Sequence, residues 1–321
     1  MTRHVLIIGA TGGAGSALTD VCLKRGWKVT ALTRRSVVDR PNLPSVHWVE
    51  GDAMNAADVL RAAGGATPGP RGRVDAIFHG ANPPGYRNWA ATTPRMLANS
   101  IAAAKAVGAR LLFPGNTYNF GADAFPLLQE GAAQHPTTRK GAIRRDMEQM
   151  IHDAAADGLR AVILRAGDYF GPRAPGSWFS TAMVRPGHAV RTVRHPGYDG
   201  AGHAWAYLPD VAETAARLLE VEDRLNPVES LHMAGHWFAD GADFARATAR
   251  VAGLGPDRVK RFPWWLIRGL APIVPLFRAL SEMRYLWQTS VALDTSRLQT
   301  LIGAEPPTPL APGLRPSLAG L

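Results

Sequence analysis

Cysteine is almost absent from this 321-residue chain, which contains only Cys22. A single cysteine excludes an intramolecular disulfide and a zinc site built from several thiolates, and we predict no metal site. The N-terminal residues lead directly into a strand-like run, without an apolar signal segment. These absences favour a cytoplasmic protein.

Long uninterrupted hydrophobic runs are missing too. The most apolar stretch, residues 262–280, contains three prolines and two arginines, which is unlike a membrane-spanning helix. We expect the aromatic residues between 262 and 287 to lie in a lobe core or a pocket wall. The alternatives are a dimer surface and an interfacial membrane contact. Charged residues make up 19% of the chain and hydrophobic residues 46%. This composition excludes disorder and permits a large core.

Acidic side chains are fewer than basic ones. The chain has 36 Lys and Arg against 26 Asp and Glu, a formal net charge of +10 that favours anionic partners. No compact basic motif is present, so we predict no nucleic-acid partner. Arg185, Arg191 and Arg194 lie in a stretch without an acid before Asp199. That stretch suits either an anionic small-molecule substrate or a solvated loop.

The pattern along the chain predicts an α/β fold. Short apolar runs alternate with alanine-rich helical stretches, which is typical of a Rossmann-type, doubly wound parallel sheet. We expect a Rossmann domain over 1–172, completed by 206–235, and a smaller, mainly helical substrate lobe made of 173–205 and 236–321. A helix to Glu222 is predicted to begin with Asp210 as its cap.

A glycine-rich turn follows the first predicted strand, residues 4–8. Glycines at 9, 12 and 15 have the spacing that makes a tight turn, lets a diphosphate approach the backbone and lets the next helix pack on the strand. The strand before and the helix after make this spacing informative. The residues expected to bind the cofactor here are Gly9, Ala10, Thr11, Gly12, Gly13, Ala14 and Gly15.

An acid is lacking where the adenosine ribose is normally selected. Residues 31–35, at the end of the second predicted strand, read Ala-Leu-Thr-Arg-Arg. An acid there would bind the 2′-hydroxyl, whereas the Arg34 guanidinium matches a 2′-phosphate. The sequence therefore favours NADP(H) over NAD(H), and a solvated arginine pair is the alternative.

Several segments, in order, resemble the short-chain dehydrogenase/reductase superfamily, and within it the extended and atypical NAD(P)-dependent epimerase/dehydratase-like proteins. They are the turn 9–15, then 50–53, 78–82, 164–172, 207–212 and 308–314. The resemblance implies that Asp52 and Ala53 hold adenine. It also implies that Gly80, Ala81 and Asn82 line the cofactor and that 164–172 lies beside the nicotinamide.

The catalytic signature departs from that family. Its members present a Tyr with a Lys four residues on, followed four residues later by a Glu. Aligned on Glu148, this chain has Arg144 in place of the Lys and Lys140 in place of the Tyr; aligned on Lys140, it has Pro136 in place of the Tyr. Neither register restores the pair.

Two groups of residues are candidates for the missing chemistry. Lys140, Arg144 and Glu148 share one helix face. One interpretation is that these residues only form salt bridges. The other is that Lys140 is desolvated beside Arg144, which lowers its pKa and lets it act as the acid/base. After the fifth predicted strand, Asn116 and Thr117 can hydrogen-bond a substrate, and Tyr118 is the nearest replacement phenol.

The sequence thus predicts an NADP(H)-dependent oxidoreductase or epimerase-like enzyme that moves a hydride between the nicotinamide and a carbonyl or hydroxyl carbon of a small molecule. The alternative is a catalytically inactive nucleotide-binding sensor or scaffold of the same fold. A homodimer is compatible with either.

Overall fold

A seven-stranded parallel sheet lies at the centre of the computed structural model, which describes residues 2–35, 45–65, 72–83, 88–174, 176–185, 187–306 and 308–319. The strand order is β11-β7-β5-β4-β1-β2-β3. The strands are β1 (His4–Ile8), β2 (Lys28–Thr33), β3 (Val46–Glu50), β4 (Ala76–His79), β5 (Arg110–Gly115), β7 (Arg160–Ala166) and β11 (Val228–Met233). The order reverses at β1, between β2 and β4, where α/β sheets bind ligands. The predicted Rossmann-type sheet is confirmed.

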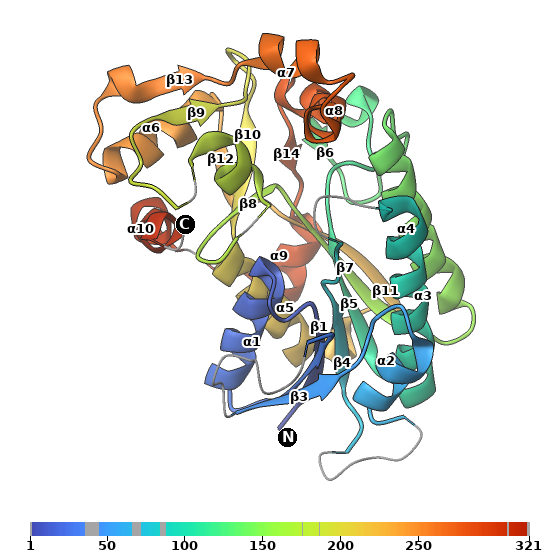
Figure 1. The fold of residues 1–321 in the computed structure, drawn as a ribbon. Helices are drawn as coiled ribbons and strands as arrows, with labels where there is room; N and C mark the ends of the chain where they lie inside the picture. Colours follow the sequence, from blue (N-terminus) through green and yellow to red (C-terminus); the bar gives the residue numbers. More distant parts are fainter. Residues whose placement is uncertain are drawn as a thin grey trace.

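Helices cover both faces of the sheet because its strands are apolar on both sides (Figure 1). Val5 and Ile7 of β1 point into one core and Leu6 and Ile8 into the other, as the two-residue period of a strand requires. The first core lies under α1 (Gly13–Lys24), α5 (Leu208–Glu220) and α9 (Ser296–Ile302). The second lies under α2 (Ala56–Ala62), α3 (Trp89–Val107) and α4 (Arg139–Ala155).

The remaining elements form a smaller lobe with an aromatic core. Trp205 and Phe244 stack at its centre, with ring centroids 4.2 Å apart. Its helices are α6 (Ala242–Val251), α7 (Trp264–Leu270), α8 (Pro275–Glu282) and α10 (Leu310–Ala319). Its strands are β8 (Asp168–Phe170), β9 (Val193–His195), β10 (His203–Tyr207), β12 (His236–Phe238) and β13 (Val259–Arg261), and β6 (Leu127–Leu128) pairs with β14 (Ala292–Leu293). The lobe has the expected helices and also short strands, all but β10 of only two or three residues.

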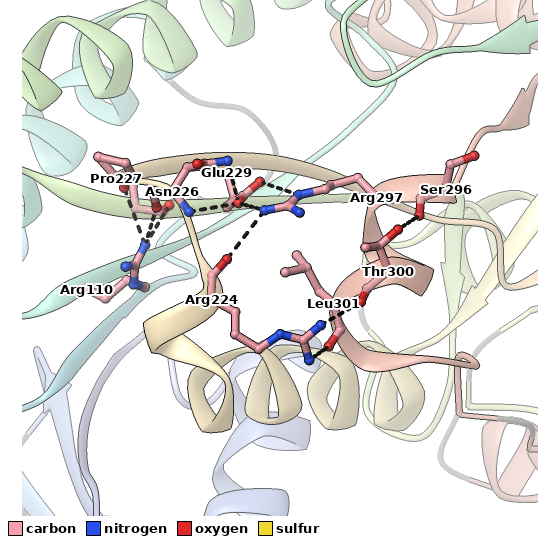
Figure 2. A network of polar contacts seen from close by, with 10 residues as sticks. Arg110, Arg224, Asn226, Pro227, Glu229, Ser296, Arg297, Thr300 and Leu301 are labelled. Carbon is pink, nitrogen blue, oxygen red and sulfur yellow. Dashed lines mark hydrogen bonds and ion pairs between the residues drawn. The ribbon is translucent and has the colours of Figure 1, made fainter.

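Polar contacts fasten α9 to the edge of the central sheet (Figure 2). The Arg297 guanidinium donates to Glu229 of β11 at 2.6 Å, and Glu229 is buried. Arg224, just beyond α5, donates to the Leu301 carbonyl at 2.7 Å. These contacts tie a C-terminal segment to the sheet that carries the glycine turn.

The prediction that Asp210 caps its helix is wrong. Helix α5 begins at Leu208, because Pro209 fits the first turn of a helix and needs no amide partner there. Asp210 lies inside that turn and accepts hydrogen bonds from the Thr308 hydroxyl at 2.6 Å and the Thr308 amide at 3.3 Å. Across the described ranges, no helix is both long and apolar enough to cross a bilayer.

Candidate functional site

The glycine turn between β1 and α1 is shaped for a close backbone approach. Gly9 has φ +92°, and a Cβ there would lie 2.6 Å from the Gly80 carbonyl oxygen. A Cβ on Gly15 would lie 2.2 Å from the Gly9 carbonyl oxygen, so both positions require glycine. Helix α1 starts after Gly12, which has no side chain to cap its first N–H groups. The turn therefore fits a diphosphate at a helix N-terminus.

The residues expected at the adenosine lie just after the neighbouring strands β2 and β3. Thr33 of β2 is paired with Glu50 of β3, so Arg34 and Asp52 follow adjacent strand ends. The Arg34 side chain is exposed. Asp52 accepts a hydrogen bond from the Met54 amide at 2.9 Å, which fixes the turn around Ala53. Both residues thus follow neighbouring strand ends of the central sheet.

A cavity of about 370 Å³ extends from the glycine turn along the carboxyl ends of the strands. All five residues predicted to be catalytic line it, namely Asn116, Thr117, Tyr118, Lys140 and Arg144. Four of the thirteen residues predicted to bind the cofactor, Ala14, Gly80, Ala81 and Asn82, line it as well. The fold thus brings part of the predicted cofactor group and the predicted catalytic group to one cavity. Helix α8 contributes Ala279 and Leu280 to the opposite wall. This volume lies in the range of ~300–1,000 Å³ that small-molecule sites occupy.

Lys140 is buried at the N-terminal end of α4 and is bound to α8. Its Nζ donates to the Ala279 carbonyl at 2.9 Å and lies 4.0 Å from a Glu282 carboxylate oxygen. Its backbone amide donates to Glu282 at 3.0 Å. Burial lowers the pKa of Lys140 to about 8, and Glu282 opposes that shift. The lowered pKa agrees with the interpretation of the sequence, but the charge beside Lys140 is a carboxylate and not Arg144.

The Lys140, Arg144 and Glu148 face is not a solvated salt-bridged surface. Arg144 is buried, lies 4.4 Å over the Phe113 ring and donates to the Pro114 carbonyl. Glu148 pairs with Arg165 of β7 through two hydrogen bonds of 3.0 and 2.8 Å. This face of α4 is therefore buried, and its hydrogen bonds connect the helix to the sheet. Arg144 also lines the cavity.

Three residues at the cavity carry a buried polar atom without a hydrogen-bond partner in the described part of the chain. These atoms are His79 Nε2, Arg144 Nε and the Tyr169 hydroxyl. Burial lowers the pKa of His79 to about 3, with Arg144 acting in the same direction. Burial raises the pKa of Tyr169 to about 12, which Arg144 opposes. A neutral imidazole, a guanidinium and a neutral phenol thus meet here, and unpaired buried polar groups of this kind mark a place for a bound group.

His79 and Tyr169 are functional candidates that the sequence reasoning missed. Both lie in segments that carry the family resemblance, His79 at the end of β4 and Tyr169 in β8. Position in those segments is the only signal in the sequence, because their unpaired atoms depend on packing from several elements. Asp168 also lines the cavity, and its carboxylate is paired with the His203 ring at 2.7 Å.

Other predicted residues are placed differently. The side-chain oxygen of Asn116 accepts a hydrogen bond from the Tyr118 amide at 3.0 Å, which shapes the loop after β5. Arg185, Arg191 and Arg194 are exposed and do not line the cavity. Within the described ranges, no three His, Cys, Asp or Glu side chains gather as metal ligands.

The model of the NAD dependent epimerase/dehydratase family matches residues 5–233 of this chain. A curated relative from a Streptomyces species, 3-diazoavenalumate denitrifying reductase, is 25% identical over 272 residues, covering 79% of this chain and 83% of the relative.

Solved structures share the fold. The Bordetella bronchiseptica enzyme WbmH in complex with NAD⁺ has a TM-score of 0.73 and 18% identity, covering 100% of this chain and 98% of its own. The Thermotoga maritima UDP-glucose 4-epimerase with UDP-glucose has a TM-score of 0.72 and 15% identity, covering 99% and 98%. With a family model that spans more than two thirds of its length, the chain belongs to the NAD dependent epimerase/dehydratase family.

Proposed function

We propose that this protein is an NADP(H)-dependent reductase of a small carbonyl compound. The observation that carries the proposal is one cavity that is lined both by Ala14 of the glycine turn and by Lys140, Arg144 and Tyr118. The Streptomyces relative is named a reductase, which supports reduction as the direction. When bound, the cofactor supplies the hydride, and the protein supplies positioning and the proton.

The choice of NADP(H) rests on Arg34. Its exposed guanidinium follows β2 at the position where an acid would select NAD(H), and the chain has no acid there. Charge-assisted contacts are worth ~1.5–3 kcal/mol, so Arg34→Ala should weaken NADPH binding by roughly ten- to a hundredfold and leave NADH almost unchanged.

Titration of the protein with both cofactors, followed by fluorescence, measures this preference. Arg35→Ala is the matched control, because Arg35 is also exposed and lies one residue further on. Equal affinities for NADPH and NADH in the unmutated protein contradict the proposal.

Lys140 is our first choice as proton donor. Its lowered pKa makes the ammonium a stronger acid than an ordinary lysine while keeping it largely protonated at neutral pH. As the hydride adds to the carbonyl carbon, the C=O electron pair moves to oxygen, which takes a proton from Nζ. Asn116 and Thr117 line the same cavity, which supports a role for them in hydrogen-bonding that oxygen. Tyr118 is the rival predicted from the sequence, and Tyr169, a protonated buried phenol, is the rival that the structure adds.

Turnover with a panel of carbonyl compounds, followed as NADPH consumption, separates these candidates. A positioned acid contributes 10²–10⁴-fold, so Lys140→Met should lower turnover by about that factor with little change in NADPH affinity. Tyr118→Phe and Tyr169→Phe serve as parallel variants. If Lys140→Met keeps turnover within a few-fold, the acid is another group. Tight NADPH binding without any substrate supports the inactive sensor instead.

A further inference from the structure

The outer face of α7 and the turn after it are apolar and exposed. Trp265 is 78% exposed and Ile273 79%, and Leu266 and Leu270 are exposed beside them. In the described part of the chain, six large hydrophobic side chains are exposed, and four of them are these. Scattered single hydrophobic residues need no explanation, whereas a cluster marks an interaction surface.

The inner face of α7 explains why these residues stay outside. The Trp264 indole donates to the Pro196 carbonyl at 2.7 Å, and its ring packs edge-on against Phe262 with centroids 5.0 Å apart. Ile267 is buried on the same side. Helix α7 is therefore held by Trp264 and Ile267, and the lobe core does not use Trp265 or its exposed neighbours.

The surface around this face is basic. From Arg258 to Ser281 the chain contains no Asp or Glu. It contains five exposed cations, Arg258, Lys260, Arg261, Arg268 and Arg278. Arg258 and Arg261 have carboxylate partners in Asp257 and Asp199. Lys260, Arg268 and Arg278 make no ion pair within the described ranges, so their charge is available to a partner. Strand β13, α7 and α8 lie together at the end of the molecule away from the N-terminus (Figure 1).

We propose that this face, the exposed side of residues 258–278, binds the surface of an anionic lipid membrane. A helix that presents Trp and Leu outward amid Lys and Arg has the chemistry of an interfacial segment, in which apolar side chains enter the headgroup boundary and cations meet anionic lipids. The short helix α7 lies on the bilayer surface and does not span it.

A second copy of the chain fits this face less well. A twofold dimer would bring the same patch of each copy against the other. Asp257 and Asp199 offset only Arg258 and Arg261, so the charges of Lys260, Arg268 and Arg278 would repel across the interface. A stable interface also buries ~800 Å² per partner, which four side chains on and just after a seven-residue helix do not supply. Charge complementarity therefore selects the anionic membrane.

Co-sedimentation of the full-length protein with vesicles tests the proposal. Vesicles of phosphatidylcholine with phosphatidylglycerol should bind the protein, binding should weaken as salt rises, and pure phosphatidylcholine should bind little.

The double variant Trp265→Ser, Ile273→Ser should bind the anionic vesicles at least about tenfold less than the parent. Lys260→Gln with Arg268→Gln should lose about fivefold for each charge removed. Trp237→Ser, at an exposed Trp outside this face, is the matched control and should bind like the parent.

All the substituted side chains are exposed, so we expect the variants to fold like the parent. Melting temperatures equal to that of the parent would show that folding is intact. Absence of binding to the anionic vesicles overturns the proposal, as does equal binding by the Trp265→Ser, Ile273→Ser variant. A parent dimer that Trp265→Ser converts to a monomer, without vesicle binding, assigns the face to a second copy instead.

Discussion

Lys140 illustrates what a sequence can and cannot tell about one residue. Its place on α4, four residues before Arg144, is readable from spacing, and so is its potential for a lowered pKa. Its partners Ala279 and Glu282 lie about 140 residues further on, in a segment without a recognisable motif. The sequence therefore identified the residue and missed the carboxylate beside it.

Replacement of Lys140 should also change stability in a pH-dependent way. Its pKa of about 8 lies below the ordinary 10.5, so between these values the unfolded chain holds a proton that the folded chain does not. Stability of the parent thus rises with pH across that window, and below it the buried charge opposes folding fully. Lys140→Met should therefore be more stable than the parent near neutral pH, by roughly 1–3 kcal/mol after loss of the Ala279 hydrogen bond.

Urea unfolding of parent and Lys140→Met at about pH 7 and pH 9.5 measures this effect. The advantage of the variant should shrink at the higher pH, where the folded parent has already lost the proton. A difference in unfolding free energy that is the same at both pH values would show that Lys140 does not titrate in this range.

The strands of the central sheet and those of the lobe differ in how well their positions can be predicted from the sequence. The strands of the central sheet are nearly continuous apolar runs, so the first strand was predicted at residues 4–8, where the structure has β1. The lobe strands β8 and β9 have three residues each, too few for any alternation to show. Their pairing partners come from 203–207 and 259–261, and such long-range pairing is not encoded locally.

The buried ion pair between Glu148 of α4 and Arg165 of β7 should be essential for stability. Glu148 and Arg165 are both almost completely buried, and Arg165 holds the pKa of Glu148 below its ordinary value although burial acts to raise it. Removing one partner of a buried pair typically costs ~3–5 kcal/mol, so Glu148→Gln should lower the unfolding free energy by about that amount.

The control lies on the same helix. Asp146 is exposed and paired with Arg145 at 2.7 Å, and Asp146→Asn should cost less than ~1 kcal/mol. Both values come from chemical denaturation. Equal effects of the two substitutions would mean that the buried pair does not join α4 to the sheet as the geometry indicates.

At the scale of the whole molecule, the cofactor should stabilise both parts of the chain together. The cavity is lined by the sheet and by the lobe helix α8, so a cofactor there contacts a surface that exists only when both are folded. At a free concentration 100 times its Kd, NADPH should raise the unfolding free energy by about 2.7 kcal/mol. The division of the chain at residues 172, 206 and 235 remains a prediction.

Thermal unfolding with and without NADPH checks this coupling. A single transition that moves upward with NADPH, and less with NADH at the same concentration, agrees with the proposal. Two transitions, of which NADPH shifts only one, would show that the lobe unfolds independently of the cofactor site.

The contact between Lys140 and α8 ties the candidate proton donor to the position of the smaller lobe. The Nζ atom that lines the cavity also bonds the Ala279 carbonyl and lies near Glu282. A shift of α8 would therefore move the amino group relative to the cavity. Substitutions in α8 that change its packing are expected to alter proton transfer without touching any residue of the sheet.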